Sequence, residues 1–455
     1  MGEEDKLTTK AKAVYGAGYL GVSLSTFAIT TWLATYYLPP EGGKTIIPDM
    51  VFFGKAVAAA YLFGLAQSVG RFLNAIADPL IGYLSDNTRS RLGRRRPYIL
   101  IGTPVLVILF LLVFRPTFPA GNPGNFYHLL ITINLFYLFY AIVITPYLSL
   151  LPEIARSTAE RIRLSGWQTI FNVAGVACAV ILGDIVRHYF GYWVMSLFFA
   201  ALIFAAFFLP GIRIKERTVV KEGQRIGFWR ALAITLENKP FIIFLLGQTL
   251  VWFGFSLIQG ALRHVVVALM GLQTVGMAKC LFLSLTVAVI CMPLVFKLTH
   301  KYGKKRAYII MVSTFVPLLA AIYLLRSPWV GNFTTPLGYI IFALMGIPIS
   351  AFFIIPNSIL GEIIDYDEKH TGLRREAIYF STQSLINKTG LAISSILMGI
   401  LLSIGYTVDN PMGIRLLGPT AAAFVLCGMI VFSFYPLEDA AFRRTHGRNR
   451  TKGEV

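Results

Sequence analysis

Twelve long apolar segments dominate this chain, and each is close to the length that an α-helix needs to cross a lipid bilayer. Such a crossing takes about 20 predominantly apolar residues. Apolar runs and helix breakers place the expected spans at 13–38, 55–85, 97–115, 128–151, 166–187, 191–211, 240–264, 274–297, 306–325, 338–360, 376–404 and 416–434. Only 14% of the residues are charged, far below the usage of soluble domains. The pattern predicts an all-α membrane protein.

Basic residues gather in alternate loops between these spans. The net charge of +19 is compatible with a nucleic-acid partner, but short basic clusters beside apolar spans are typical of cytoplasmic loops in membrane proteins. The clusters fall at 89–96, 156–163, 213–225, 301–306 and 369–375. We therefore expect a multi-pass protein of the plasma (inner) membrane with both termini in the cytoplasm. The lipid bilayer is its expected environment, and no nucleic-acid partner is expected.

Two sequence similarities at one offset indicate an internal duplication. "RLGRRRPYIL" ends at Leu100 and "KYGKKRAYII" at Ile310, while "PYLSLLPEI" begins at Pro146 and "PNSILGEI" at Pro356, so both pairs are 210 residues apart. The expected organisation is a six-helix half at 1–211, a cytoplasmic linker at 212–239, a second six-helix half at 240–436 and a basic tail at 437–455. Transporters built from repeats bind their substrate between the repeats, near the bilayer midplane.

One face of the 55–85 segment is polar. Gln67, Arg71, Asn74 and Asp78 follow the spacing i, i+4, i+7 and i+11, which puts them on one side of a helix. Charged side chains at membrane depth cost at least a few kcal/mol, so they normally face a bundle interior or a wet cavity. Two interpretations remain open: a buried ion pair that ties spans together, and a binding site for a cation or solute.

A second polar group lies in the 376–404 segment. Ser381, Ser384 and Lys388 share a helix face, and Lys388 is expected within reach of Asp78, unless it extends instead toward the membrane surface. Further aromatic and amide candidates in other spans are Tyr140, Gln168, Gln248 and Trp252. The four cysteines and six histidines show no metal-ligand spacing, so no metal site is expected. The sequence also shows no constellation of a nucleophile with its catalytic partners, so no enzyme is expected. A receptor or scaffold is a further alternative, and such a protein would show no solute flux.

Several motifs resemble one transporter family. "DPLIGYLSDNTRSRLGRRRPYILIG" resembles the second span and following loop of the melibiose-carrier family, the glycoside–pentoside–hexuronide:cation symporters of the major facilitator superfamily. "GEIIDYDEKHTGLRREAIYFSTQSLINK" resembles its loop between spans 10 and 11, and "TPYLSLLPEIA" its span 4 exit. The string "SRLGRRRPY" is also similar to plant-type sucrose:proton symporters. The resemblance implies a major facilitator fold of twelve transmembrane helices in two pseudo-symmetric six-helix halves. It also implies cation-coupled symport of a small solute, a glycoside or related carbohydrate, by alternating access.

The resemblance also implies a cation site. The family uses two aspartates on span 2 and one on span 4, whereas this sequence keeps Asp78 and has Asn74 and Ile144 at the other two positions. The arginine before the pair corresponds to Arg71 and the span 11 lysine to Lys388. Cation coupling is therefore expected at Asp78, Asn74 and Lys388. A sodium ion is bound by several oxygen ligands, and this sequence keeps one of the family's three acids. The coupling ion is therefore expected to be a proton rather than sodium. No other cofactor is expected.

The solute site is expected from the same resemblance. Its candidate residues are Arg71, Tyr140, Gln168, Ser384, Lys388, Trp252 and Gln248. Where melibiose carriers have a sugar-binding aspartate on span 1 and an arginine on span 5, this chain has Ser23 and Gln168, which argues against melibiose-like galactosides. The alternative solute is a lysophospholipid or other anionic amphiphile, as carried by a related vertebrate branch. The expected partners are thus a small-molecule solute and a coupling cation, and the expected state is a monomer.

The arginine-rich loop after span 2 resembles a gate. Major facilitator proteins carry a "G-x-x-x-D…G-R-R" segment there, which locks the cytoplasmic side of the outward-open state. Gly82, Asp86, Gly93, Arg94 and Arg95 fit this cytoplasmic gate. Alternatively, the arginines serve only to keep this loop on the cytoplasmic side of the membrane. The two roles are compatible.

Overall fold

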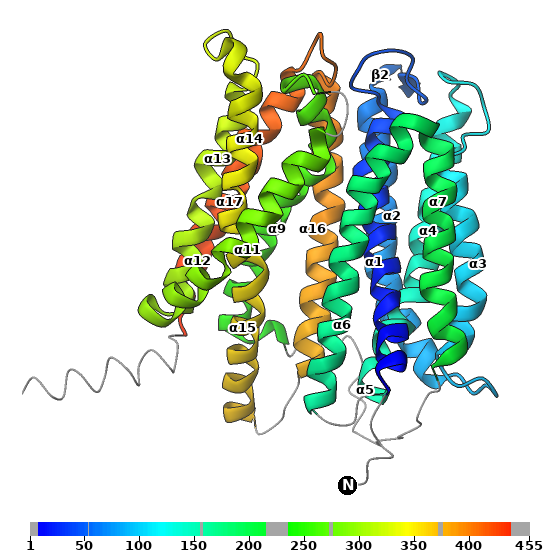
Figure 1. Ribbon diagram of the computed structural model, residues 1–455, viewed down its shortest axis with the longest axis vertical. Coiled ribbons are helices and arrows are strands. Elements are labelled where there is room, and N and C mark those ends of the chain that lie inside the picture. Colours follow the sequence, from blue (N-terminus) through cyan, green and yellow to red (C-terminus); the bar gives the residue numbers. More distant parts are fainter. Residues whose placement is uncertain are drawn as a thin grey trace, which may run out of the picture. The chain divides into compact units, whose positions relative to one another are not determined.

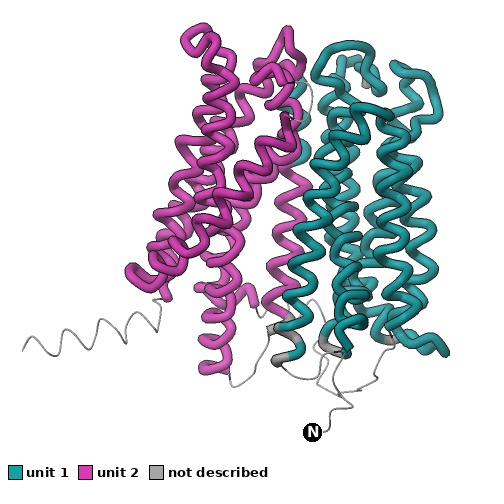
Figure 2. Tube along the Cα trace, viewed as in Figure 1, with its two compact units in different colours: residues 1–224, 395–403 teal, residues 225–394, 404–455 magenta. Residues whose placement is uncertain are grey.

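The chain divides into two compact units, which are described separately. The computed structural model describes residues 8–52, 54–154, 158–214, 235–272, 276–371 and 376–437. Unit 1 comprises 1–224 with 395–403, and unit 2 comprises 225–394 with 404–455 (Figure 2). The division at 224/225 lies inside the expected linker. Of the expected linker and tail, residues 215–234 and 438–455 lie outside the described residues.

Unit 1 is built almost entirely of helices (Figure 1). Its elements are α1 (Thr9–Tyr37), β1 (Met50–Phe52), β2 (Lys55–Val57), α2 (Ala59–Asn87), α3 (Arg96–Val113), α4 (Gly124–Ser149), α5 (Leu151–Ile154), α6 (Thr158–Ala177), a π-helical turn (Cys178–Leu182) and α7 (Gly183–Arg213). β1 and β2 form an antiparallel hairpin with Met50 opposite Val57. Helix α2 packs on α4, α1 on α6 and α7, and α3 on α4 and α7.

All of the regular secondary structure in the described residues of unit 2 is helical. Its elements are α9 (Lys239–Gly260), α10 (Leu262–His264), a π-helical turn (Val265–Leu269), α11 (Gly276–Tyr302), α12 (Lys304–Ser313), α13 (Phe315–Ala321), 3₁₀ turns (Ile322–Leu324 and Gly331–Phe333), α14 (Thr334–Leu344), α15 (Gly346–Thr371), α16 (Glu376–Ile404) and α17 (Met412–Ser433). Helix α9 packs on α17, and α11 on α15. Residues 395–403 of α16 cluster with unit 1, whereas the sequence pattern assigned the whole 376–404 segment to the second half.

Ten helical stretches among the described residues are long and apolar enough to cross a membrane. One of them, Arg163–Arg213, has 51 residues. A helix of that length measures roughly 75 Å, more than twice the hydrocarbon thickness of a bilayer. Gly191 interrupts it with φ 81° and ψ 174°, so it makes two passages. Helix α2, with its polar face, is not among the ten, but its 29 residues are long enough to cross. Each of the ten stretches, α2 and the two parts divided at Gly191 overlap an expected span, and the count of twelve spans stays a prediction.

Several expected span boundaries were wrong. Residues 55–57 form β2 instead of opening the second span, because Gly54 (φ 76°) turns the chain and Asp49 Oδ1 accepts the Ala59 N–H at 2.8 Å where α2 starts. A short apolar run does not distinguish strand from helix. Helices α6 and α15 extend beyond the expected 166–187 and 338–360 segments, since hydropathy detects only the apolar part of a helix.

The π-helical turn in unit 1 is supported by a side chain. Trp32 of α1 donates its indole N–H to the Ala179 carbonyl at 2.7 Å, and Ala179 lies in the turn. A π-turn disturbs the regular i to i−4 ladder, and a backbone group displaced in an apolar environment needs another partner. Trp32 is fully buried, and this bond fixes α1 against the turn that joins α6 to α7.

Candidate functional site

Tyr137 of α4 meets three residues of the polar face of α2. The Tyr137 hydroxyl donates to Gln67 Oε1 at 3.1 Å and accepts from Arg71 Nε at 3.3 Å. The Tyr137 carbonyl accepts from Asn74 Nδ2 at 3.1 Å. Gln67 and Asn74 are 3% and 5% exposed. The structure thus brings three of the four residues on the α2 face to one tyrosine that sequence reasoning missed.

Gly70 explains how the ring of Tyr137 reaches this position. A Cβ at position 70 would lie 2.5 Å from Cδ2 of the Tyr137 ring, so the ring lies directly against the backbone of α2. Positions 67, 70, 71 and 74 share one helix face. A glycine in the middle of an otherwise polar face was the one sequence signal for a large partner. It did not reveal which residue that partner is.

Asp78 is held two turns further along the same contact. Its Oδ1 accepts from the Thr145 hydroxyl of α4 at 2.8 Å, and the carboxyl group is half-buried. Gln67 contacts Tyr137, and Asp78, which is later in α2, contacts Thr145, which is later in α4. The two helices therefore run in the same direction here. Small apolar residues, Ala77 and Ala141, fill the contact between the polar pairs.

Helix α1 adds hydroxyl groups to this region. Arg71 Nη2 donates to Thr30 Oγ1 at 3.4 Å, and the Tyr140 hydroxyl lies 2.7 Å from Thr26 Oγ1. Thr26 and Thr30 are one turn apart on α1. The combined surface of α1, α2 and α4 therefore joins one guanidinium and one carboxylate to several neutral hydroxyl and amide groups. We call these residues the α2–α4 polar site: Thr26, Thr30, Gln67, Arg71, Asn74, Asp78, Tyr137, Tyr140 and Thr145.

Gln168 and Ser23 lie in contacts between α1 and α6. Gln168 Nε2 donates to the Tyr15 hydroxyl at 3.2 Å and is 7% exposed. The Tyr15 ring stacks on that of Tyr147 at 5.0 Å between centroids. Ser23 donates to Asn172 Oδ1, another polar residue that sequence reasoning missed. The described contacts do not bring Gln168 to the α2–α4 polar site, and its solute-binding role stays a prediction.

The predicted site residues of unit 2 lie on α9 and α16. Gln248 is 2% exposed and accepts from the Tyr308 hydroxyl at 2.7 Å. Trp252 lies among aromatic rings, with the Phe352 centroid 4.8 Å away. Ser384 is exposed and Lys388 half-buried on α16. Lys388 belongs to unit 2 and Asp78 to unit 1, and the expected approach of the two side chains stays a prediction.

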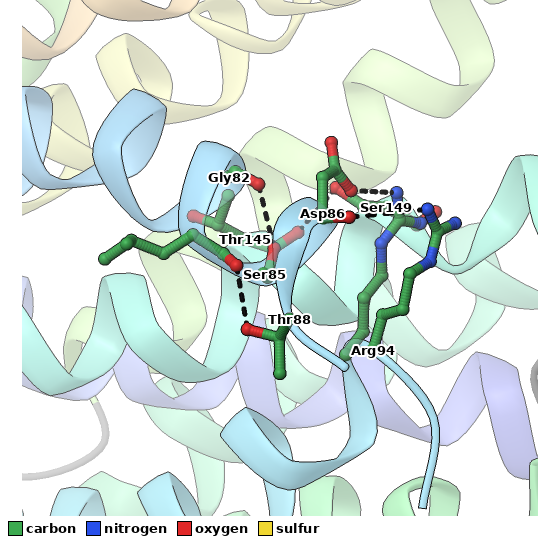
Figure 3. A network of polar contacts seen from close by, with 9 residues as sticks. Gly82, Ser85, Asp86, Thr88, Arg94, Thr145 and Ser149 are labelled. Atoms are coloured by element: carbon green, nitrogen blue, oxygen red, sulfur yellow. Dashed lines mark hydrogen bonds and ion pairs between the residues drawn. The ribbon is translucent and has the colours of Figure 1, made fainter. Parts of the chain in front are cut away.

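The loop between α2 and α3, residues 88–95, brings together most of the predicted gate (Figure 3). Arg95 Nη2 lies 2.7 Å from Asp86 Oδ1, and Arg95 also donates to the Ser149 carbonyl at the end of α4. Arg94 Nη1 reaches the Asp86 carbonyl at 3.5 Å. Gly93 has φ 107°, in the left-handed region that favours glycine. The ends of α2 and α4 and the start of α3 thus meet around two arginines.

The described contacts of Gly82 do not include the two arginines, and its role in the gate stays a prediction. Gly82 makes no close approach: a Cβ there would meet only Thr145 Cγ2, at 3.8 Å. Its carbonyl accepts from Ser85 Oγ at 3.0 Å, away from the arginines. Arg96, which was not among the gate candidates, donates to the Gly211 and Ile212 carbonyls at 2.7 Å each and so holds the end of α7.

Comparison with known proteins decides the family. The MFS/sugar transport protein family matches residues 14–439. The chain belongs to that family. The glucuronide carrier protein homolog of Escherichia coli is 26% identical, with 87% of each chain covered. Sodium-dependent lysophosphatidylcholine symporter 1 of Gallus gallus is 24% identical over 96% of this chain and 88% of the relative. The crystal structure of the nucleoside transporter NupG has a similar fold, with TM-score 0.68, 13% identity, and coverage of 94% and 98%.

Membership of the MFS/sugar transport protein family confirms the predicted major facilitator fold and the resemblance on which it rested. The protein is a multi-pass integral membrane transporter and not an enzyme. Within this family fold, the α2–α4 polar site has one property that its sequence did not reveal. Asn74 uses its N–H₂ group toward a carbonyl, a role that a carboxylate, which only accepts, cannot fill.

Proposed function

We propose that the protein is a secondary active transporter that couples the movement of a cation to that of a small solute by alternating access. The solute is a glycoside or related carbohydrate, and the coupling cation is a proton rather than sodium. The protein lies in the plasma (inner) membrane with both termini in the cytoplasm. The observation that carries the proposal is the α2–α4 polar site, in which Arg71 and Asp78 lie among neutral hydrogen-bonding groups.

The preference for a proton follows from the chemistry of Asp78 and Asn74. Intramembrane carboxylates mark proton relays and ion pathways. Asp78 supplies a carboxylate whose described partner is the Thr145 hydroxyl, while Asn74 directs its N–H₂ to a backbone carbonyl. A proton needs one carboxyl oxygen, whereas sodium needs several oxygen ligands. Lys388 is proposed to respond to the charge of Asp78.

The solute assignment is supported by the groups around Arg71. The hydroxyls of Thr30 and Tyr140 suit hydrogen bonding to a sugar, and the guanidinium suits an acidic substituent. The similarity to a glucuronide carrier homolog agrees with such a solute. Further proposed solute contacts come from Gln168, Ser384, Lys388, Trp252 and Gln248, and the proposed cytoplasmic gate from Gly82, Asp86, Gly93, Arg94 and Arg95.

A second candidate is transport of a lysophospholipid or other anionic amphiphile. The chain is similar over 96% of its length to a lysophosphatidylcholine symporter. Unit 2 also holds an aromatic group, in which Trp252 lies 4.8 Å from Phe352 and 6.0 Å from Phe255 and Phe353, centroid to centroid. Such rings suit an acyl chain.

Asp78→Asn tests the coupling role. Purified protein in proteoliposomes is given radiolabelled methyl β-D-glucuronide or lysophosphatidylcholine under a pH gradient, a sodium gradient or neither. We expect the wild type to accumulate the glucuronide under the pH gradient. We expect Asp78→Asn to lose all uphill accumulation but to keep solute exchange, because only the proton-carrying group has been removed.

The matched control is Asp409→Asn, at an exposed turn residue, which should transport like the wild type. Full uphill accumulation by Asp78→Asn would contradict the coupling assignment. Accumulation of lysophosphatidylcholine in place of the glucuronide would select the second candidate.

A further inference from the structure

Tyr137 lies at the centre of the α2–α4 contact but belongs to neither the solute nor the cation residues proposed above. It holds three members of the α2 face, Gln67, Arg71 and Asn74, by its hydroxyl and its carbonyl. Its ring lies against Gly70, where a Cβ would leave no room. The hydroxyl, the carbonyl and the ring of Tyr137 therefore each make a different contact with α2.

The directions of these hydrogen bonds orient the Arg71 side chain. A phenol has one O–H proton and accepts through its oxygen lone pairs. The Tyr137 proton goes to Gln67 Oε1, which leaves the lone pairs for Arg71 Nε at 3.3 Å. Arg71 Nη2 also reaches Thr30 at 3.4 Å. The guanidinium is thus held at two of its nitrogens, from two different helices, and a planar group held at two points has a fixed plane.

We propose that Tyr137 is a positioning residue for the solute, acting by fixing the plane of the Arg71 guanidinium before the solute binds. The inference rests on the proposed function. A preorganised binding group loses less conformational freedom on association, so the benefit appears as affinity. Asp78 accepts from the Thr145 hydroxyl, a hydrogen bond that removal of the Tyr137 hydroxyl leaves in place.

Tyr137→Phe removes the hydroxyl and keeps both the ring and the carbonyl that accepts from Asn74. We expect it to raise the KM for uptake roughly tenfold, the effect of losing a hydrogen bond to a charged group. Vmax and the accumulation ratio at saturating solute should stay close to wild type. Gly70→Ala removes no polar group but displaces the Tyr137 ring together with its hydroxyl, and it should raise the KM in the same way. Uptake is measured in the same proteoliposomes, with methyl β-D-glucuronide and lysophosphatidylcholine as the probes.

Two matched controls carry the same substitutions, Tyr to Phe and Gly to Ala, at positions outside the contact between Tyr137 and α2. Tyr127→Phe alters an exposed tyrosine of the same helix, and Gly166→Ala alters a helical glycine with no heavy atom within 4 Å of the added Cβ. Both should keep the wild-type KM. Thermal unfolding in detergent identifies a variant that fails to fold.

The outcomes separate this inference from the proposed function. Wild-type vesicles that accumulate neither probe overturn the proposed function and, with it, this inference. Normal wild-type uptake with an unchanged KM in Tyr137→Phe overturns the inference alone. A lower melting temperature with reduced Vmax and unchanged KM also overturns it, because that pattern marks a purely structural tyrosine.

Discussion

The loop between α2 and α3 in unit 1 and the junction of α11 and α12 in unit 2 come from the duplicated sequence, yet they are stabilised differently. Both turn at a glycine with positive φ, 107° at Gly93 and 81° at Gly303. Both follow the glycine with basic residues. In unit 1 Arg95 pairs with Asp86 of the preceding helix, whereas in unit 2 Lys304 pairs with Glu362 of α15, at 2.6 Å.

The second basic contact is similar in kind but shifted by one position, because Arg96 and Lys305 are 209 residues apart and the two similar stretches are 210 apart. Arg96 donates to carbonyls at the end of α7, and Lys305 donates to the Tyr435 carbonyl just after α17, at 2.7 Å. In each unit a cation thus meets the carbonyl end of that unit's last long helix, where the helix dipole favours positive charge. The two similar stretches thus share the glycine turn, while the cation at the helix end is shifted by one position and the acidic partner comes from a different helix in each unit.

The largest effect should come from the two turn glycines. We expect Gly93→Ala and Gly303→Ala each to lower the free energy of unfolding by about 1–2 kcal/mol, since the left-handed region is strained for residues with a Cβ. Thermal unfolding in detergent measures the change. Gly166→Ala and Gly361→Ala, whose added Cβ has no heavy atom within 4 Å, serve as controls and should not lower stability. A large loss at one turn glycine and none at the other would break the comparison.

The helix-end contacts should give a smaller effect. We expect Arg96→Ala to cost about 1 kcal/mol and Lys305→Ala less, because Arg96 makes two carbonyl bonds and Lys305 one. Denaturation of the two variants side by side measures the difference. Equal or reversed losses would show that the number of carbonyl bonds does not set the strength of this contact.

The ion pairs should give the smallest effect and should differ between the units. The side chains of Lys304 and Glu362 are 25% and 23% exposed, while Asp86 is 51% exposed. Pairs this open to solvent contribute about 0–1 kcal/mol. We expect Glu362→Gln to lower stability slightly more than Asp86→Asn, with both losses shrinking in high salt. A loss at Asp86→Asn that is larger and independent of salt would reverse the ranking.

The sequence allowed the helical passages and the polar face of α2 to be predicted, because both follow from a period within one segment. Partners across helices could not be predicted in the same way. Tyr137 and Tyr140 lie one turn apart on α4, and only the packing against Gly70 decides that Tyr137, not Tyr140, meets the α2 face. The β-hairpin before α2 was missed because a three-residue strand has no period that hydropathy can detect.

Under the proposed function, the direction of the Asn74 amide has a consequence for redesigning the coupling ion. Restoring a second acid by Asn74→Asp would set a carboxylate against the Tyr137 carbonyl, where two acceptors repel. The new acid would then disturb the α2–α4 contact before it could serve a metal ion. A change of coupling ion therefore requires one substitution on each helix. The change on α4 is the more difficult of the two, because the group that faces position 74 is a backbone carbonyl, which a side-chain substitution does not remove.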